Sequence, residues 1–280
     1  MTASSRTFRL SKIDGDSAKS VDDQVAVEEP LEIRLGYSTP DGRTASSVSI
    51  TMRTPGFDAE LATGFLFSES IVHNASDIMK VEHCGPAAPD SGNHNIVRVD
   101  LAPNVAVDLG RLQRHFYTTS SCGVCGKSSL DALRVTGARP LSDNHAKFSK
   151  ASLIALPDAL RARQQTFEQT GGLHAAAAFD SQGEIIVVKE DVGRHNATDK
   201  AIGALLQEGA LPGHNYGLLV SGRASFELMQ KTLVAGIPLL AAVGAPSSLA
   251  VQTAKEFDMT LVGFLRDAKF NIYAGLDRII

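Results

Sequence analysis

The chain has 280 residues, of which 43% are hydrophobic and 21% are charged, and its formal net charge at pH 7 is −4. This composition is typical of a soluble globular protein with one large core or two domains. The slight acidity and the lack of Trp argue against a general nucleic-acid-binding protein, which usually has a basic face and aromatic side chains for stacking. Three cysteines are too few, and an odd number, for the disulfide framework of a small secreted protein.

Residues 1–28 are mostly small, polar or charged, and they contain no apolar run long enough for a signal peptide or a bilayer span. They predict a flexible tail, a cytoplasmic location and no contact with a membrane.

Residues 29–117 predict a small N-terminal α+β domain. Apolar and polar residues alternate here as they do in half-buried strands. One predicted helix has an acidic first turn, and its N-cap is assigned to Asp58. The expected strands are 31–35, 48–52, 78–83 and 95–101, and the expected helix is 58–69.

Residues 118–150 predict a mobile loop and a connection. The loop, 118–128, is small and polar and has no hydrophobic periodicity to hold it to a core, and a helix can begin at Ser128 or Ser129.

Residues 151–280 predict a C-terminal α/β domain, which makes the chain α+β overall. Strands alternate here with helices, a pattern typical of a parallel or mixed sheet covered on both faces. The expected helices are 151–168 (interrupted at Pro157), 196–208, 224–235 and 247–256, and the expected strands are 174–179, 185–188, 218–220, 238–243 and 261–265.

Three of these strands are followed by polar turns that lead into helices, at 189–196, 221–225 and 244–248. Ligands in such sheets bind beyond the carboxyl ends of the strands, and helix N-termini favour anions. Together the turns favour a site for a phosphorylated ligand, whereas for any one of them alone helix capping is the preferred explanation. No phosphate-loop or GxGxxG spacing is present, so we expect the ligand to be bound and not hydrolysed.

The side chains expected at this site come from those turns and from the start of strand 174–179. Arg194 and Arg223 supply forked donors for phosphate oxygens, although Arg194 could instead pair with Glu190 or Asp191. His174 is explained equally well as a core residue, whereas a ligand contact is favoured for His195. The full set is Gly193, Arg194, His195, Ser221, Arg223 and His174.

Cys122 and Cys125 form a CxxC pair in the polar loop. Zinc needs four ligands and Cys84 stands alone, so we expect no structural metal. A thioredoxin-like dithiol would lie between a strand and a helix, and a chance surface pair would be an oxidation liability. A nucleophilic sulfur carrier fits best, because Lys127 and the nearby helix start favour the thiolate.

Six motifs, in order along the chain, together resemble the FdhD family of sulfurtransferases required for formate dehydrogenase activity. They are ELATGFLFSE at 60–69, SSCGVCG at 120–126, TGGLHAAA at 170–177, EDVGRH at 190–195, SGRAS at 221–225 and LVGF at 261–264.

The resemblance implies a homodimer with a cytidine-deaminase-like, three-layer C-terminal domain. It also implies that sulfur passes from a cysteine desulfurase to the molybdenum bis(molybdopterin guanine dinucleotide) cofactor of formate dehydrogenase, with Cys122 carrying the persulfide. The implied cofactor-binding segment is Phe264, Leu265, Arg266, Asp267, Ala268 and Lys269. Deaminase chemistry is not expected, because residue 176 is Ala where a zinc deaminase needs Glu.

Three questions stay open at this stage. Cys125 could resolve the Cys122 persulfide or only tune the Cys122 thiol. The chain could also be a non-catalytic chaperone of the cofactor or the dehydrogenase, with the cysteine pair as a redox sensor. A nucleotide-binding oxidoreductase is the remaining alternative.

Overall fold

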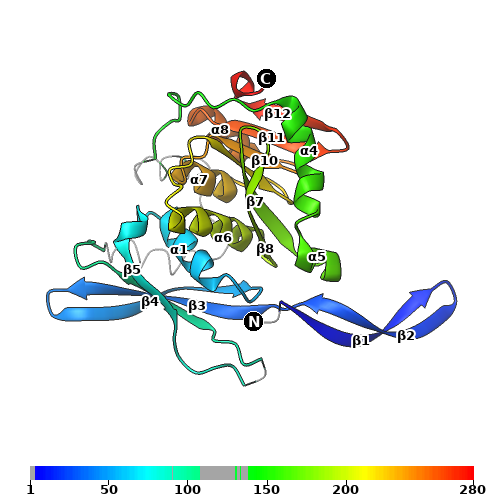
Figure 1. Ribbon diagram of the computed structural model, residues 1–280, viewed down its shortest axis with the longest axis horizontal. Coiled ribbons are helices and arrows are strands. Elements are labelled where there is room, and N and C mark those ends of the chain that lie inside the picture. The colour runs from blue at the N-terminus through cyan, green and yellow to red at the C-terminus, as the bar shows by residue number, and fades with distance from the viewer. Residues whose placement is uncertain (1–3, 90, 108–129, 131–132, 134–137) are drawn as a thin grey trace.

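The protein is described here by a computed structural model, which covers residues 1–280 except 1–3, 90, 108–129, 131–132 and 134–137 (Figure 1). Its strands form a two-stranded ribbon, a four-stranded sheet in the order β4-β3-β6-β5 and a six-stranded sheet in the order β12-β11-β10-β9-β7-β8.

The four-stranded sheet forms the N-terminal part of the body. It contains β3 (Glu29–Thr39), β4 (Gly42–Arg53), β5 (Ile78–His83) and β6 (Ile96–Leu101), and α1 (Asp58–Ser68) lies on one of its faces (Figure 1). The predicted alternation is confirmed in β3, where Leu31, Ile33 and Leu35 are buried. The predicted N-cap is wrong, because the cap is Phe57 and the Asp58 carboxylate instead bonds Arg53 at 2.9 Å.

The six-stranded sheet is mixed. Its strands are β7 (His174–Asp180), β8 (Ile185–Asp191), β9 (Tyr216–Val220), β10 (Leu239–Ala242), β11 (Thr260–Arg266) and β12 (Lys269–Ala274). β9, β10 and β11 run parallel, whereas β7 is antiparallel to both of its neighbours, β8 and β9.

Helices cover both faces of this sheet, so the predicted three-layer α/β arrangement with a mixed sheet is confirmed (Figure 1). One face carries α6 (Arg194–Gln207), α7 (Phe226–Val234) and α8 (Ser248–Glu256), and the other carries α4 (Lys150–Arg161) and α5 (Gln165–Thr170). The apolar side chains divide accordingly: Ala176 and Val220 pack on the α6 side, and Ala177 and Leu219 pack with α4.

α1 and α6 cross so closely that they join the two sheets into one stack. A Cβ added at Gly64 would lie 1.9 Å from the Asp199 carbonyl oxygen, and one at Gly203 would lie 1.9 Å from the Glu60 carbonyl oxygen. The two backbones can meet only because both positions are glycine. One apolar core therefore runs from the N-terminal sheet to the C-terminal sheet.

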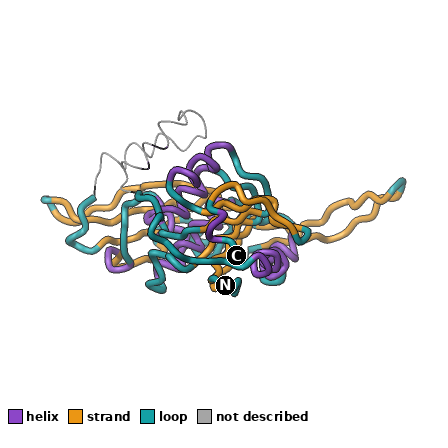
Figure 2. Tube along the Cα trace, turned by 90° about the horizontal axis from the view of Figure 1, so that it is seen from above, coloured by secondary structure: helices purple, strands orange, loops and turns teal. Residues whose placement is uncertain are grey.

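The prediction of a tail without regular structure over residues 1–28 is wrong. β1 (Ser5–Asp14) and β2 (Ser17–Ala26) form an antiparallel ribbon that projects from the body (Figures 1 and 2). The physical reason is a two-residue hairpin turn that starts with Gly15 at φ 58°, a conformation that glycine adopts without strain. Cross-strand pairs such as Arg9 with Asp22, at 2.9 Å, hold the strands together.

The predicted helix break at Pro157 is also wrong. α4 continues through Pro157 because Leu153, Leu156 and Leu160 form a buried stripe whose packing offsets the missing backbone hydrogen bond. The helix ends at Arg161, and α5 begins four residues later at Gln165.

Candidate functional site

The predicted polar turns meet at one edge of the six-stranded sheet. β8, β9, β10 and β11 end there, and β7, which runs the other way, begins there. Backbone hydrogen bonds join the turns: Ser221 N–H donates to Ala175 O at 3.0 Å, Gly244 N–H to Gly222 O at 2.9 Å and Phe264 N–H to Gly244 O at 3.0 Å. The structure thus brings His174 and the three turns together at the edge that the sequence predicted.

His174, the first residue of β7, lies against the turn that follows β9. A Cβ added at Gly222 would be 3.5 Å from His174 Nδ1, and the neighbouring Ala175 N–H donates to Ser221 Oγ at 2.9 Å. Burial lowers the pKa of His174 and the positive charge of Arg194 lowers it further, while Asp191 acts in the opposite direction. His174 is therefore a neutral imidazole at pH 7, half-buried at the site.

Arg194 is the first residue of α6, and its Nε atom is buried with no hydrogen-bond partner among the described residues. The two acids that could have paired with it have other partners. Glu190 accepts hydrogen bonds from the Thr166 and Phe167 amides at 3.0 and 2.8 Å, and Asp191 pairs with Lys200 at 2.6 Å. The predicted alternative of a structural ion pair is not observed, which leaves the guanidinium able to bind an anion at the helix N-terminus.

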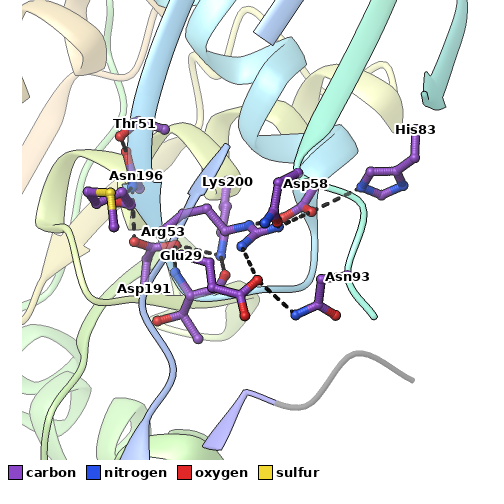
Figure 3. Close-up of polar contacts among 12 residues, drawn as sticks. Glu29, Thr51, Arg53, Asp58, His83, Asn93, Asp191, Asn196 and Lys200 are labelled. Atoms are coloured by element: carbon purple, nitrogen blue, oxygen red, sulfur yellow. Dashed lines mark hydrogen bonds and ion pairs between the residues drawn. The ribbon is translucent and has the colours of Figure 1, made fainter. Parts of the chain in front are cut away.

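The end of β8 is held by a buried polar network that sequence reasoning missed (Figure 3). Lys200 Nζ binds Asp191 and donates to the Thr54 carbonyl oxygen at 2.9 Å, and the Thr54 N–H donates to Asp191 at 3.2 Å. Asn196 donates to Asp191 at 3.0 Å and to the Met52 carbonyl oxygen at 2.7 Å. These bonds tie the predicted turn to β4 and so fix the start of α6.

A second network in the same view lies in the N-terminal sheet (Figure 3). Arg53 is fully buried, pairs with Asp58 at 2.9 Å and donates to Asn95 at 3.0 Å, and His83 Nε2 lies 3.0 Å from Asp58. It supports the fold, and its residues do not line the strand-end edge.

His195 faces the other side of α6, towards α7. Its Nε2 atom lies 3.4 Å from Glu227 Oε2 and 3.5 Å from Ser225 Oγ. Burial lowers the pKa of His195, and Lys231, Arg194 and His174 add to this effect, whereas Glu227 opposes it.

Beyond His195 lies a buried ion pair that sequence reasoning also missed. Lys231 Nζ donates to both Asp199 carboxylate oxygens at 2.9 Å, and Ser68 donates to Asp199 at 2.9 Å. Burial raises the pKa of Asp199 to about 6. Burial acts to lower the pKa of Lys231, but nearby carboxylates, chiefly Asp199, raise it overall. Charged residues on otherwise buried helix faces were the sequence signal for this pair.

The predicted segment 264–269 is only partly available to a ligand. Phe264 is half-buried at the strand-end edge with φ 55°, and the turn formed by Asp267 and Ala268, both in the left-handed region, is exposed with Arg266 and Lys269. The Leu265 side chain is fully buried in the core against α4, so within this segment only its backbone can face a ligand. The backbone is irregular at Phe264, where the β11–β12 register shifts between Gly263 and Arg266, and this irregularity places Leu265 on the same side of the sheet as Val262.

The remaining predicted residues have different outcomes. Arg223 is exposed beside the edge, and Gly193 is the N-cap of α6. Cys122 and Cys125 lie outside the described residues, as do Lys127, Ser128 and Ser129. Cys84 is a free, half-buried cysteine. The described part of the chain contains no group of His, Cys, Asp or Glu side chains arranged to hold a metal ion.

A family model described as "FdhD/NarQ family" matches residues 26–280. The chain belongs to the FdhD/NarQ family. The resemblance seen in the six sequence motifs is thereby confirmed.

Curated relatives in several organisms are named "Sulfur carrier protein FdhD". The protein from Streptomyces coelicolor is 52% identical over 259 residues, which are 92% of this chain and 89% of that protein. The Mycobacterium tuberculosis protein is 46% identical and covers 97% of both chains, and the Saccharolobus solfataricus protein is 38% identical and covers 98% of both.

The fold has a solved counterpart. A crystal structure from Desulfotalea psychrophila, described as that of a formate dehydrogenase accessory protein, matches with a TM-score of 0.74 at 24% identity and covers 99% of this chain and 100% of its own. This match supports the fold alone. Among the described helices, none has the length and apolar character needed to cross a membrane.

Proposed function

We propose that this FdhD/NarQ family member is a sulfur carrier that serves the maturation of formate dehydrogenase. The observation that carries the proposal is the match of residues 26–280 to the family, together with relatives named as sulfur carriers at up to 52% identity over nearly the whole chain. The sequence adds the CxxC pair, which fits a nucleophilic carrier better than a zinc site.

The carrier thiol in this proposal is Cys122. Its thiolate attacks the outer sulfur of a persulfide on a cysteine desulfurase, a new sulfur–sulfur bond forms on Cys122, and the desulfurase cysteine leaves as a thiolate. No net oxidation occurs in this step, because one persulfide replaces another. Lys127, two residues after Cys125, favours the attacking thiolate.

The acceptor in this proposal is the molybdenum bis(molybdopterin guanine dinucleotide) cofactor, bound as a substrate at the strand-end edge. Arg194 suits its phosphate oxygens because its guanidinium has a buried Nε without a partner in the described residues and stands at the start of α6. Gly193, Ser221 and His174 border the same place, and Arg223 and the exposed turn 266–269 extend it. His195 closes the side that faces α7.

Cys125 has two possible roles in the second step. As a resolving thiol, its thiolate attacks the Cys122 sulfur of the persulfide, hydrosulfide leaves for the cofactor, and a Cys122–Cys125 disulfide forms that an external dithiol must reduce. As a tuning residue, it stays reduced and only adjusts the Cys122 thiol. A Cys125→Ala variant that delivers sulfur over many cycles would remove the resolving role.

The test is persulfide mapping. The full-length protein is incubated with a cysteine desulfurase and isotopically labelled cysteine, and its peptides are then analysed by mass spectrometry. We expect the label on Cys122 in the wild type and in the Cys84→Ser control, and no loading of Cys122→Ser. Label on Cys125 with none on Cys122 would overturn the assignment.

A second assay separates transfer from the chaperone alternative. Sulfur-depleted formate dehydrogenase is mixed with loaded wild-type or Cys122→Ser protein, and formate oxidation is measured. Activation by the serine variant would favour a non-catalytic chaperone. The cytoplasmic location expected from the sequence stays a prediction.

A further inference from the structure

β4 is an edge strand of the four-stranded sheet, and no strand in the described ranges pairs with its outer edge. It is 12 residues long, and its stretch TASSVSITM at 44–52 contains no charged residue and no proline. Sheets usually protect an exposed edge with charges, proline, a bulge or a short strand, because unpaired backbone groups can add another strand. Apart from one register shift against β3, β4 lacks these protections.

The backbone of β4 offers hydrogen-bonding groups on its outer side at alternate residues. Asn196 of α6 donates to the Met52 carbonyl oxygen at 2.7 Å, and Pro30, which lies opposite Met52 in β3, has no N–H to pair with that oxygen. The peptide groups of Met52 therefore face away from β3, and alternation turns those of Ile50 outwards as well. Within the described structure, residues 44–50 make no backbone hydrogen bond to any element other than β3.

A groove of about 560 Å³, called the β4 groove below, lies beside this edge between β4, α1, α6 and α7. Its apolar wall includes Val48, Leu61 and Phe65. Ile50 and Met52 also line it and are 68% and 47% exposed. Because side chains alternate along a strand, a strand added to β4 would direct every second side chain into this groove.

The β4 groove carries a negative charge. Its described lining has four carboxylates and one lysine, namely Glu28, Glu69, Asp199 and Glu227 with Lys231. Lys231 is bound to Asp199. Glu227 has only the neutral His195 within ion-pair distance in the described structure, and Glu28 is exposed with no ion-pair partner there. A basic side chain in the groove would therefore meet carboxylates that lack a cation.

We propose that the β4 groove docks an extended, basic segment of a partner protein, which adds a strand to β4. Backbone hydrogen bonds to the outward groups at Ile50 hold the segment, as in other complexes formed by strand addition. Its lysine or arginine side chains lie beside Glu28 and Glu227, and its apolar side chains cover Met52. The proposal does not depend on sulfur transfer by Cys122.

A second copy of this chain does not have the charge that the β4 groove favours. Its projecting strands belong to the β1–β2 ribbon, residues 5–26, called the arm below. The arm has as many basic as acidic residues, Arg6, Arg9, Lys12 and Lys19 against Asp14, Asp16, Asp22 and Asp23. Arg9 is already paired with Asp22 at 2.9 Å, and the whole chain has a net charge of −4. Charge complementarity therefore favours a basic partner of another kind.

The first experiment measures the binding of synthetic peptides to the full-length protein by fluorescence anisotropy at physiological salt. The probe is a fluorescein-labelled, capped decapeptide in which lysine alternates with valine, and the matched control has glutamate in place of lysine. We expect a micromolar dissociation constant for the basic probe and binding of the acidic control that is weaker by roughly tenfold or more. Equal binding of the two would overturn the proposal. So would equally tight binding of a peptide of residues 5–26, because the groove would then accept this chain itself.

A second pair of probes separates strand addition from simple attraction between charges. Methylation of the backbone nitrogen at alternate residues of the basic peptide keeps every charge and removes the N–H groups along one edge. Because only one edge of the added strand faces β4, methylation of one alternate set should abolish binding, and methylation of the other set should leave it unchanged. Equal binding of both methylated peptides would contradict strand addition.

Variants of the full-length protein locate the site. Glu227→Lys should weaken binding of the basic probe roughly tenfold and strengthen binding of the acidic control. Ile50→Pro removes one outward N–H from the edge, where proline is tolerated, and should weaken the basic probe as well. Glu184→Lys is the matched control, because Glu184 is an exposed carboxylate paired with Arg163 at the β7–β8 turn. Equal effects of the Glu227 and Glu184 changes would place the binding elsewhere and overturn the proposal.

Discussion

Arg194 is the residue whose surroundings say most about the strand-end site. Both neighbouring acids are committed elsewhere, Glu190 to the amides of α5 and Asp191 to Lys200, so the guanidinium has no internal counterion in the described structure. A buried donor without a partner costs free energy in the unliganded protein. An anionic ligand removes that cost when it binds.

Arg194→Ala should therefore weaken binding of the nucleotide end of the cofactor. Loss of a charge-assisted contact is worth about 1.5–3 kcal/mol, which corresponds to a rise in Kd of roughly tenfold to a hundredfold. Titration calorimetry with guanosine diphosphate gives the Kd. Arg163→Ala is the control, because Arg163 is exposed and pairs with Glu184 away from this edge. An unchanged Kd for Arg194→Ala would remove the residue from the site.

The same substitution should alter the titration of His174. Arg194 is one cause of the lowered pKa of His174, so its removal should raise that pKa towards the ordinary histidine value, although burial still keeps it lowered. Histidine carbon-13 NMR over pH 4 to 8 measures this directly. If His174 titrates identically in both proteins, the two side chains are not close enough to interact as described.

At this scale the sequence could predict which turns form the site but not which side chains face it. Glycines and helix-start residues identified the turns around Gly193 and Ser221, because the backbone conformation of a turn depends mainly on residues that are adjacent in the sequence. By contrast, the ion pair between Asp191 and Lys200 depends on tertiary packing, which brings β8, α6 and the Thr54 amide together. The resemblance names Leu265 as a position in the binding segment, but it does not show that the irregular backbone at Phe264 turns the Leu265 side chain into the core.

At the scale of elements, the crossing of α1 and α6 depends on two glycines. Gly203→Ala should destabilise the protein by about 3 kcal/mol or more, because the new Cβ would lie 1.9 Å from the Glu60 backbone oxygen and the helices would have to separate. Urea unfolding gives the free energy. Gly172→Ala is the matched control, since its nearest neighbour is at an ordinary 3.7 Å. Equal stabilities of the two variants would show that the crossing tolerates a wider spacing.

Elements with strong local signals were predictable, and those stabilised by distant contacts were not. The strand at Ile78–His83 was located to the residue, and the helix beginning at Asp58 to within one residue. The arm was missed because its polar composition hides a hairpin whose main signal is Gly15. Pro157 was given too much weight, because the buried leucine stripe of α4 offsets its local cost.

At the scale of the whole molecule, Asp199 and Lys231 lie where the two halves of the stack meet. Asp199 belongs to α6, Lys231 to α7 and their partner Ser68 to α1, so the pair joins three helices in one buried contact. Removing one member of such a pair leaves a buried charge without its counterion. The protonation of Asp199 therefore affects how firmly the halves are held together.

The pKa of Asp199 rises from its ordinary 3.8 to about 6 in the folded protein. Because the folded state binds this proton more tightly than the unfolded chain, the resulting stabilisation is full below pH 3.8 and is lost as the pH rises to about 6. The free energy of unfolding of the wild type, minus that of Asp199→Asn, should then fall by an amount on the order of 3 kcal/mol between pH 4 and 6.5. Lys231 stays protonated throughout, since its pKa is raised from 10.5.

Urea unfolding of both proteins at four or five pH values measures that difference, and carbon-13 NMR of the Asp199 carboxyl group gives its midpoint independently. If the difference in unfolding free energy between the wild type and Asp199→Asn grows with pH, the ionised Asp199–Lys231 pair is the favoured form. The attraction of Lys231 for the carboxylate would then outweigh the cost of burying its charge. A midpoint near 6 with a falling difference would establish that burial dominates. The junction between the two sheets would then loosen as the pH rises from 4 to 6, in the opposite sense to a surface carboxylate paired with a cation.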